Sequence, residues 1–446
     1  MNKCPHKAEN YTGVCPHIFA DTSVDNLEGV KEFTGNARDA KFFCKSCYED
    51  SPVIDHQLCD ECVKTIDSSG EWEVEGLPGV IRNPQPFRFE RRELTFGALA
   101  AAEIKQFAPF NASNTKAIVF NSDGQLWLVD IVSGESDLLT TLASEKLDRT
   151  GDISLCLSPD DQYLAITSLV YNRREANKAS NKGLVLLLPK CEVCLHLDCG
   201  DYHTEEAQFP VTFIQDGKRN LLVHATDWNR LDITDLSTGE CLTNRNLDDM
   251  PEAEAVSGQH DILGTEWSGR LLPSPDQHRI ATIGWVWHPV GLAFSWSVKD
   301  WFNNIWEADC GPSKRSYAMW EYFWYSPFVW LDNKRLCIWG YDRIQPFKDM
   351  PTPSAAVYDA ESGKLLHFFV GPTMDVFYFD EFLFSGLTAD ESNTVGISVW
   401  SVDDGSLLHE QKDIRADAYH PGTKEFVTIE DDGNWSFHRW QAPKGV

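Results

Sequence analysis

Cysteine and histidine residues near the N-terminus recur in spacings that suit zinc. Cys-Pro-His occurs twice, at Cys4–His6 and Cys15–His17, and Cys-x2-Cys follows at Cys44–Cys47 and Cys59–Cys62. Extended chain places residues i and i+2 on one side, and proline favours extended geometry in the residue before it. Each Cys-x-His unit can therefore offer sulfur and imidazole to one ion. Eight such ligands are enough for two closed tetrahedral zinc sites.

The sequence leaves two ways to pair these ligands. In a sequential pairing, the two Cys-x-His units share one ion and the two Cys-x2-Cys units share the other: Cys4, His6, Cys15 and His17, then Cys44, Cys47, Cys59 and Cys62. In a cross-braced pairing, each Cys-x-His unit shares an ion with one Cys-x2-Cys unit. His56 is an alternative ligand.

The predicted role of both ions is structural. A catalytic zinc keeps a coordination position open for water, whereas eight ligands fill two sites. A redox role for the Cys44–Cys47 pair would need a surrounding βαβ pattern, which the sequence does not show. About 65 residues bury little apolar surface, and zinc can contribute on the order of 10 kcal/mol to folding.

A third group of cysteines, at positions 191, 194 and 199, does not suit a metal site. Aligned with later parts of the chain, Cys194 corresponds to Cys241 and Leu365, in what we expect to be an outer strand. Residues three apart in a strand face opposite sides, so Cys191 and Cys194 cannot easily share an ion. We also find no Gly-x-Ser-x-Gly, His-Glu-x-x-His, phosphate loop or dinucleotide-binding glycine pattern.

Tryptophan is concentrated in residues 284–330, which hold eight of the sixteen in the chain. One interpretation is that these rings pack a long insertion, or the zinc module, onto the wall of the larger domain. The other is an exposed patch that binds a partner, because Trp and Tyr are enriched at binding hot spots. The candidate residues for that patch are Trp287, His288, Trp296, Trp301, Trp306 and Trp320.

Beyond the N-terminal module the chain repeats itself. An apolar stretch, a polar turn and an alternating strand recur seven times, at 108–120, 155–167, 211–225, 271–283, 328–340, 376–386 and 417–429. A second unit follows most copies, with an alternating strand, an acidic residue and a Gly-containing turn, as in "QLWLVDIVSGESDLL" and "AAVYDAESGKLLHFF". Both units are typical of antiparallel hairpins, and two hairpins make a four-stranded sheet.

Residues 91–446 therefore resemble a seven-bladed β-propeller of the WD40-like class. "SPDDQYLAI" and "SPDQHRIATI" match the inner hairpin turn common in that class, and "VD", "TD", "YD" and "WS" stand where its Trp-Asp pair would fall. The resemblance implies an all-β fold with a small N-terminal zinc-binding domain. A strand at about 92–104 is expected to complete the last blade and close the ring. An α+β fold is the alternative.

The charge of the chain excludes some classes of partner. The formal net charge is −29, and residues 1–65 hold only 7 basic and 11 acidic residues, so the larger domain is strongly acidic. Such a field repels nucleic acid and anionic membranes and attracts basic proteins. No run reaches the roughly 18 apolar residues of a membrane span, and the N-terminus has no apolar core like that of a signal peptide. Thirteen cysteines without such a signal indicate a reducing cytoplasm.

Three parts and one leading function are predicted. The parts are a zinc module (1–65), a connector packed on the propeller (66–90) and the propeller (91–446). The leading function is a non-enzymatic cytoplasmic inhibitor, or immunity protein, that sequesters a basic partner such as a nuclease toxin. The alternatives are a constitutive scaffold or adaptor that reads peptides or modified proteins, and a propeller hydrolase.

Overall fold

The structure is a computed structural model of the 446-residue chain. In the N-terminal part it describes the backbone of residues 2–3, 11–14, 28–33, 40–44, 56–59 and 71–75. From residue 80 to 443 it describes all residues except 100–101, 112, 144–146, 172–179, 247–248, 250, 252–266, 287–289, 341–352, 388–394 and 431–433.

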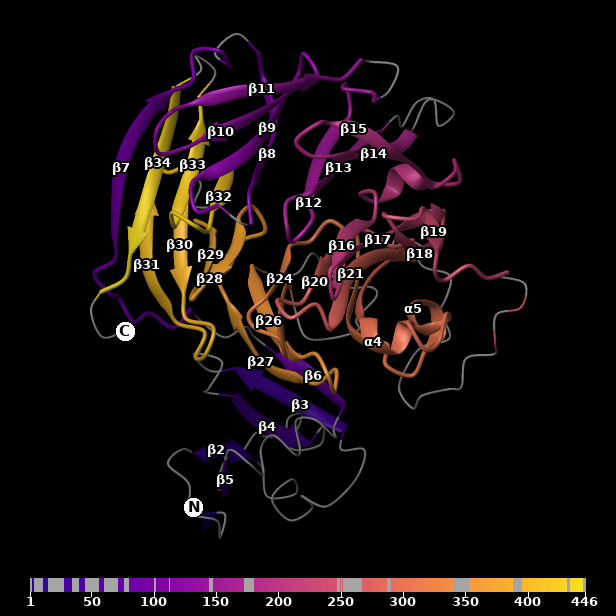
Figure 1. Ribbon diagram of the computed structural model, residues 1–446. Coiled ribbons are helices and arrows are strands. Elements are labelled where there is room, and N and C mark those ends of the chain that lie inside the picture. The colour runs from indigo at the N-terminus through magenta and orange to yellow at the C-terminus, as the bar shows by residue number, and fades with distance from the viewer. Residues whose placement is uncertain are drawn as a thin grey trace.

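The N-terminal strands form a six-stranded sheet of their own (Figure 1). Its strands, in sheet order, are β1 (Asn2–Lys3), β5 (His56–Cys59), β2 (Tyr11–Val14), β4 (Ala40–Cys44), β3 (Glu28–Phe33) and β6 (Glu71–Glu75). Strand β2 is parallel to β4 and antiparallel to β5. Strand β6 lies in the range predicted as a connector, so the small sheet extends past residue 65.

The rest of the described chain forms seven four-stranded antiparallel sheets, which confirms the predicted seven-bladed β-propeller. Blade one holds β8 (Ile104–Pro109), β9 (Lys116–Asn121), β10 (Gln125–Asp130) and β11 (Ser136–Thr141). Blade two holds β12 (Asp152–Leu157), β13 (Tyr163–Val170), β14 (Ser180–Leu187) and β15 (Glu192–Asp198). Blade three holds β16 (Val211–Asp216), β17 (Arg219–Asp227), β18 (Arg230–Asp235) and β19 (Glu240–Cys241).

The remaining four blades follow the same order. Blade four holds β20 (Leu271–Pro273), β21 (Arg279–Val286), β22 (Val290–Ser297) and β23 (Arg315–Glu321). Blade five holds β24 (Phe328–Trp330), β25 (Arg335–Trp339), β26 (Ser354–Asp359) and β27 (Leu365–Val370). Blade six holds β28 (Phe377–Asp380), β29 (Phe382–Gly386), β30 (Gly396–Trp400) and β31 (Leu407–Lys412). Blade seven holds β32 (Ala418–His420), β33 (Glu425–Ile429), β34 (Asn434–Gln441) and β7 (Arg88–Thr95).

All seven predicted repeats lie at the turn between the first and second strands of a blade. Local chemistry explains why they are recognisable. In blade two the Ser158 hydroxyl accepts a hydrogen bond from the Tyr163 amide (2.9 Å) and donates one to Asp160 (2.8 Å). Ser274 and Asp276 repeat this arrangement in blade four. These side-chain bonds satisfy turn amides that no strand partner reaches.

The blades close into a ring. The first strands of most neighbouring blades contact each other around the centre (Figure 1). A hydrogen bond or ion pair joins each neighbouring pair, in the order of the blades: Asn111–Asp161, Asn220–Asp160, Gln215–Gln277, Asp276–Asn333, Arg335–Asp403, Lys424–Glu381 and His420–Lys116. These bonds rest mostly on turn residues, so the turns hold the blades in register as well as reversing the chain.

Strand β7 supplies the fourth strand of the last blade, as the sequence predicts, but its position differs. It spans residues 88–95 rather than about 92–104, and the chain from residue 104 onward is already the first strand of blade one. Its sequence, RFERRELT, is too charged to show an apolar alternation. The buried carboxylate of Glu425 receives both guanidinium arms of Arg92, at 2.8 and 2.6 Å, and so ties β7 to the ring.

Residues 81–85 lie along the outer edge of blade six. The Leu407 amide donates to the carbonyl of Ile81 (2.8 Å), and the amides of Asn83 and Gln85 donate to the carbonyls of Leu407 (3.0 Å) and Leu408 (2.7 Å). These bonds cover the edge of β31, which would otherwise expose unpaired backbone groups. This part of the predicted connector therefore packs against the propeller.

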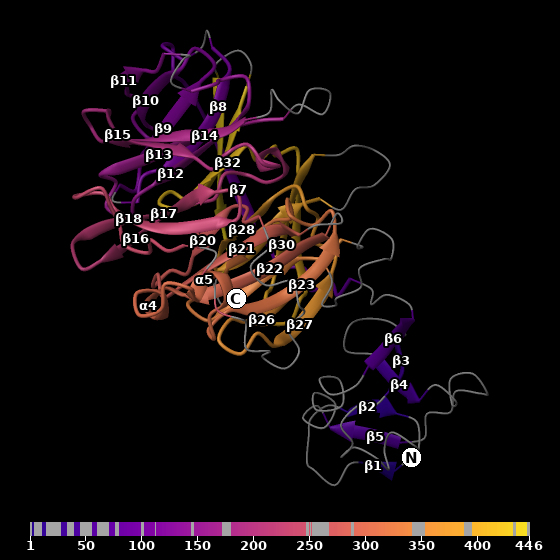
Figure 2. The ribbon, with the colours of Figure 1, turned by 90° about the vertical axis from the view of Figure 1, so that its right-hand side faces the viewer.

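The two faces of the ring carry different connections. Because successive strands run in opposite directions, the turns from first to second and from third to fourth strand lie on one face, which we call the turn face. The second-to-third connections and those between blades lie on the other, the loop face. Two short helices, α4 (Val298–Trp301) and α5 (Glu307–Cys310), interrupt a third-to-fourth connection and lie on the turn face. That face points toward the viewer in Figure 1 and to the left in Figure 2.

None of the helices in the described part of the chain has the length and apolar character needed to cross a lipid bilayer.

Candidate functional site: an aromatic surface on the loop face

Most of the predicted metal ligands lie outside the described residues: Cys4, His6, Cys15, His17, Cys47 and Cys62. Cys44 and Cys59 are described at the backbone level only, as the last residues of β4 and β5. The alternative ligand His56 is the first residue of β5. Strands β4 and β5 flank β2 and run in opposite directions, so Cys44 and Cys59 lie at opposite ends of the small sheet.

The third cysteine group lies in blade two, where the sequence predicts it. Cys194 is exposed in the outer strand β15, and Cys191 lies in the turn before that strand. Cys199 is buried, and its thiol donates to the carbonyl of Asn181. Burial raises the pKa of Cys199 to about 12, so the thiol stays protonated. Within the described part of the chain, no three His, Cys, Asp or Glu side chains gather closely enough to hold a metal ion.

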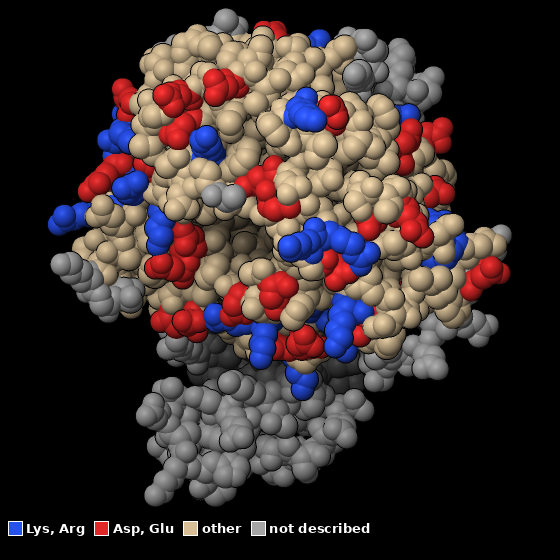
Figure 3. Space-filling view, in the orientation of Figure 1, with Lys and Arg blue, Asp and Glu red and all other residues tan. Residues whose placement is uncertain are grey.

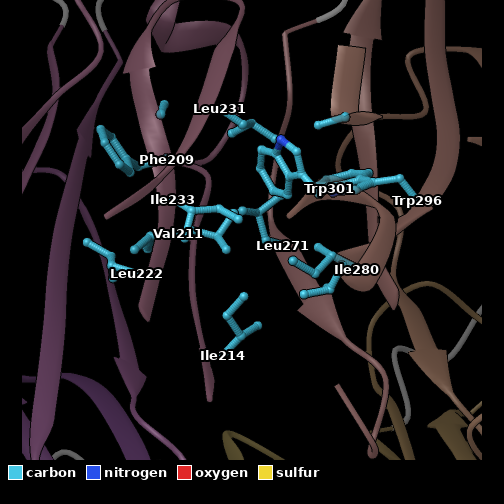
Figure 4. Packing of buried hydrophobic residues seen from close by; sticks show 14 of the residues in the cluster. Phe209, Val211, Ile214, Leu222, Leu231, Ile233, Leu271, Ile280, Trp296 and Trp301 are labelled. Carbon is cyan, nitrogen blue, oxygen red and sulfur yellow. The ribbon is translucent and has the colours of Figure 1, made fainter. Parts of the chain in front are cut away.

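The predicted tryptophan patch is wrong for three of its residues, and two more fall outside the described residues. Trp287 and His288 are the two that lie outside. Trp296 and Trp301 are completely buried between blades three and four, with their rings edge to face at 5.7 Å (Figure 4). Trp320 is buried in the core between blades four and five. Buried rings cannot act as anchors for a partner.

A buried ion network explains why the insertion turns its rings inward. Arg245 is 1% exposed and bridges Asp232 (2.8 Å) and Asp309 of α5 (2.7 Å). The half-buried ring of Trp306 lies 5.5 Å from the Arg245 guanidinium carbon. The insertion forms two short helices, α4 and α5, which are held against blades three and four. Trp301 and Trp306 pack the insertion, as the first of the two sequence interpretations proposes.

A different set of rings forms a continuous patch on the loop face. We call it the aromatic surface, and it consists of Tyr202, Trp228, Trp267, Trp285, Tyr322, Trp324 and Tyr325. Trp285 is the second-last residue of β21, and the others come from connections of blades two to five. Trp267 and Trp285 are buried and form the floor, with ring centroids 4.4 Å apart. Tyr202, Tyr322 and Tyr325 are 49%, 67% and 57% exposed.

Local bonds hold the floor of the aromatic surface in place. Trp267 and Trp285 exchange two backbone hydrogen bonds of 2.8 Å, and the Trp267 indole donates to the carbonyl of Tyr202 (3.0 Å). Nothing larger than hydrogen fits at Gly284, because a Cβ there would lie 2.5 Å from the Trp267 carbonyl oxygen. The exposed rings therefore rest on a rigid base, so little ordering entropy is lost when they bind.

Carboxylates lie at both ends of the aromatic surface. Asp201 and Asp227 are exposed beside Tyr202 and Trp228. At the other end, desolvation and then the charge of Glu206 raise the pKa of Tyr325 to about 12, with smaller effects from Tyr171 and Asp152. Tyr325 therefore keeps its phenol proton at neutral pH.

The turn face is polar, and its acids mostly serve the turns. Asp235 is 4% exposed and accepts hydrogen bonds from the amide (2.9 Å) and hydroxyl (2.6 Å) of Ser237. Asp359 and Ser362 repeat the pattern in blade five. Figure 3 shows this face, with acidic and basic side chains interspersed around a central hollow. Such carboxylates are engaged by the backbone and have little capacity left for a partner.

A cavity of about 440 Å³ lies in the centre, between the first strands of blades two to four. Its wall includes Ser154, Cys156, Gln208 and Arg270. Arg270 is exposed, and its charge lowers the pKa of Cys156, although burial raises that pKa overall to about 11. The cavity contains no acid–base pair with opposed pKa shifts, so its described walls give no basis for a catalytic assignment.

Sequence reasoning identified the right stretch of chain and the wrong rings. Residues 284–330 do contribute Trp285, Tyr322, Trp324 and Tyr325, but none of these is among the six candidates. The other three rings come from separate connections, and no spacing in the sequence links them. The sequence offers one clue to these rings, which is their position. Each lies at or just beyond the end of a strand, where a side chain need not follow the alternation between the two faces of a sheet.

Comparisons with known proteins add no family name. No protein-family model matches the sequence, and no curated protein matches it. Two solved structures that resemble the chain are the β-propeller domain of Cps50 (Swd1) from Myceliophteria thermophila and the Mitotic Checkpoint Complex. The first shows 10% sequence identity and a TM-score of 0.49, over 79% of this chain and 99% of that chain. The second shows 11% identity and a TM-score of 0.45, over 82% and 94%.

Proposed function

We propose that this chain is a protein-binding propeller that captures a basic protein partner without catalysis. The observation that carries the proposal is the aromatic surface, whose exposed tyrosines rest on a rigid floor and lie among carboxylates. Tyrosine and tryptophan provide large, stiff contact areas at low entropic cost, and they dominate binding hot spots. Carboxylates around them favour a cationic partner over a neutral or anionic one.

The charge of the whole molecule supports the same partner. A net charge of −29 speeds the approach of a basic protein and slows that of nucleic acid or an anionic membrane. In the finer form of our proposal, the partner is a nuclease toxin and the chain is a cytoplasmic immunity protein. A nuclease presents a cationic groove that an acidic surface can occupy. A scaffold that reads peptides is the second candidate, because an aromatic surface also suits that role.

Affinity purification of the full chain from its natural host, at low and high salt, tests the proposal. We expect one main partner with a basic isoelectric point, bound at low salt and released at high salt. For the immunity form, the isolated partner must degrade nucleic acid, and adding the chain must stop it. A partner that is acidic, or whose binding is insensitive to salt, would contradict the electrostatic account.

We also propose that the eight N-terminal ligands hold two structural zinc ions in the cross-braced pairing. The register of the small sheet supports this choice. Cys59 pairs with Tyr11 of β2, whereas Cys44 extends two residues beyond the pair formed by Phe42 and Val14. The two cysteines are thus separated by about five residues along the strands, or about 16 Å. Ligands of one zinc lie about 2.3 Å from the ion, so Cys44 and Cys59 belong to different ions.

Sequence adjacency completes the two sets. Cys4 follows β1, which is parallel to β5, and Cys15 follows β2, which is parallel to β4. One ion would then take Cys4, His6, Cys59 and Cys62, and the other Cys15, His17, Cys44 and Cys47. Elemental analysis should find two zinc ions per chain. In the double variant Cys4→Ser/His6→Ala one ion should be lost, and cobalt substituted at the remaining site should show the spectrum of three thiolates and one imidazole rather than the four-thiolate spectrum that sequential pairing requires.

A further inference from the structure

We infer that the central cavity of the propeller binds a small organic acid, whose carboxylate lies against the guanidinium of Arg270 and the hydroxyl of Ser154. This inference goes beyond the proposed function, because it concerns the centre of the ring rather than the aromatic surface. It also concerns a small molecule rather than a protein partner, so its failure would leave the proposed function standing.

The cavity has the size of a small-molecule site. Its volume of about 440 Å³ lies within the roughly 300–1,000 Å³ that is typical of such sites. The wall is formed by the first strands β12, β16 and β20 with the residues beside them, and it extends to Asn111 and Gln277 in turns on the turn face. Figure 3 shows that the centre of the ring is hollowed on this face. A small molecule can therefore reach the cavity from the turn face.

The cavity has one positive charge and no negative charge in its described wall. Arg270 is the only charged residue among the described residues that line it. Arg270 is exposed, and within the described part of the chain its guanidinium forms no hydrogen bond or ion pair. By contrast, the guanidinium of Arg279 in the same blade is buried and donates to Ser295 and Ser313. A guanidinium binds a carboxylate through two parallel hydrogen bonds, so Arg270 suits a ligand with this group.

Backbone packing fixes the place from which Arg270 enters the cavity. A Cβ on the preceding residue, Gly269, would lie 2.5 Å from a carbonyl oxygen of β21 and 3.9 Å from the Cβ of Ala207. The chain at 269–270 therefore lies between β21 and the segment that leads into blade three. Asn181 holds that segment, because its buried amide donates to the carbonyl of Ala207 (2.8 Å). Gln208 follows Ala207 and lines the cavity together with Arg270.

Neutral donors extend the site from Gln208 into blade two. The side-chain amide of Gln208 donates a hydrogen bond to the hydroxyl of Ser154 in β12. Because the hydroxyl oxygen accepts this bond, its own proton can be donated to a ligand. Cys156 lies two residues further along the same side of β12, and burial raises its pKa to about 11. Its thiol therefore stays protonated and adds no negative charge that would repel an anion.

The apolar part of the wall indicates which class of anion fits. Half-buried apolar residues continue from Ser154 toward the turn face, and they are Leu155, Leu157, Leu272 and Pro273. The chain from Ser154 to Leu157 spans about 10 Å, so an apolar body of that length would be covered. A phosphate group carries up to about two negative charges and would need more than one cation. A monocarboxylate with an apolar body matches the single guanidinium.

Ligand-observed NMR titrations of the full chain with matched acids and amides test the inference. The probes are octanoate and 3-phenylpropanoate, each compared with its primary amide, which has the same shape without the charge. In the wild type we expect each acid to bind about tenfold more tightly than its amide. Arg270→Gln should weaken binding of the acid about tenfold and remove this preference. Binding of the amide should change less than twofold, which shows that the cavity is intact.

Further variants separate the site from the charge of the whole molecule. Arg270→Lys keeps the charge without the planar fork, and Ser154→Ala removes the hydroxyl, so each should weaken binding of the acid about threefold. The matched control Arg88→Gln removes the same charge from an exposed residue at the start of β7 and should change binding less than twofold.

Four results would overturn the inference. They are equal weakening in Arg88→Gln and Arg270→Gln, acids that bind no better than their amides, no binding of either probe, and tighter binding of phenyl phosphate than of 3-phenylpropanoate. None of these results concerns the aromatic surface, so the capture of a basic partner is tested separately.

Discussion

The turn face and the loop face of the propeller use their side chains in opposite ways. On the turn face, Asp235 and Asp359 accept hydrogen bonds from the amides and hydroxyls of Ser237 and Ser362 in their own turns. On the loop face, Tyr202 and Tyr325 lie against tryptophan rings and are 49% and 57% exposed. Polar side chains therefore stabilise the propeller on the turn face, whereas aromatic side chains are exposed on the loop face.

This comparison predicts larger stability effects for buried polar groups than for exposed rings. The largest is expected at Arg245, which lies buried in the wall between blades three and four. Arg245→Ala leaves the carboxylates of Asp232 and Asp309 buried without their shared partner. We expect the free energy of unfolding to fall by about 3–5 kcal/mol in urea titrations. Lys182→Ala is the control, because its ion pair with Asp198 is exposed on both sides and should contribute at most about 1 kcal/mol. Equal losses of stability in Arg245→Ala and Lys182→Ala would contradict the contrast between buried and exposed side chains.

The two faces should also lose stability at opposite ends of the pH range. Bonds to Ser237 and Ser362 hold the pKa of Asp235 and Asp359 below 3.8, and turn bonds outweigh burial to do the same for Asp130, Asp160 and Asp332. Because these folded-state pKa values are lowered, the stability they contribute is present above about pH 4 and is lost as the pH falls further. Acid unfolding followed by circular dichroism should show this loss.

The same pH titration should show two further losses of stability, one in mild acid and one in alkali. Burial lowers the pKa of His224 and His420 below 6.5, so protonation starts to favour the unfolded chain below that pH. On the loop face, Tyr325 has a raised pKa of about 12 against 10, so its effect on stability is lost as the pH rises above 10. Tyrosine NMR signals should show one resonance, absent in Tyr325→Phe, that titrates near pH 12. A Tyr325 signal that titrates at 10 would contradict the desolvation of its hydroxyl group.

A single turn aspartate should have a moderate effect. Asp235→Ala removes the acceptor of the Ser237 amide and hydroxyl at a buried position, so we expect a loss of about 1–2 kcal/mol in urea titrations. Asp403→Ala is the matched control, because its side chain is 80% exposed and only pairs with Arg335. It should cost about 0.5 kcal/mol. A larger loss of stability in Asp403→Ala than in Asp235→Ala would mean that buried turn carboxylates are not the main stabilising acids.

The smallest stability effect is expected on the loop face. Tyr202→Ser removes a half-exposed ring that rests on the floor of the aromatic surface, so the free energy of unfolding should change by no more than about 0.5 kcal/mol. Thermal denaturation followed by fluorescence measures this. A loss of 2 kcal/mol would mean that the ring belongs to the core, and the contrast between the faces would disappear.

Local patterns in the sequence predict the architecture well. The turn between the first and second strands of a blade can be recognised in the sequence. Residues such as Ser158 and Asp160 form its hydrogen bonds with residues at most five positions away. Position along the blade also places Cys194 correctly in an outer strand. These features depend on neighbours in the chain, so they need no knowledge of the folded molecule.

The candidate site could not be predicted in the same way. Burial of Trp301 depends on an insertion that Arg245, 56 positions earlier in the chain, holds in place. The aromatic surface collects Tyr202, Trp228 and Trp324 from connections of different blades, and only ring closure brings them together. Strand β7 was misplaced because its sequence is charged at most positions and it pairs with the far end of the chain.

Footprinting by hydroxyl radicals tests the central claim most directly, because it reports solvent access for each aromatic side chain. The full chain is oxidised with and without its basic partner, and the modified residues are identified by mass spectrometry. We predict strong protection of Tyr202, Trp228 and Tyr325, with Val132 and Phe302 of the turn face unchanged. Protection of Val132 and Phe302, with Tyr202 and Tyr325 still oxidised at the free rate, would contradict the account.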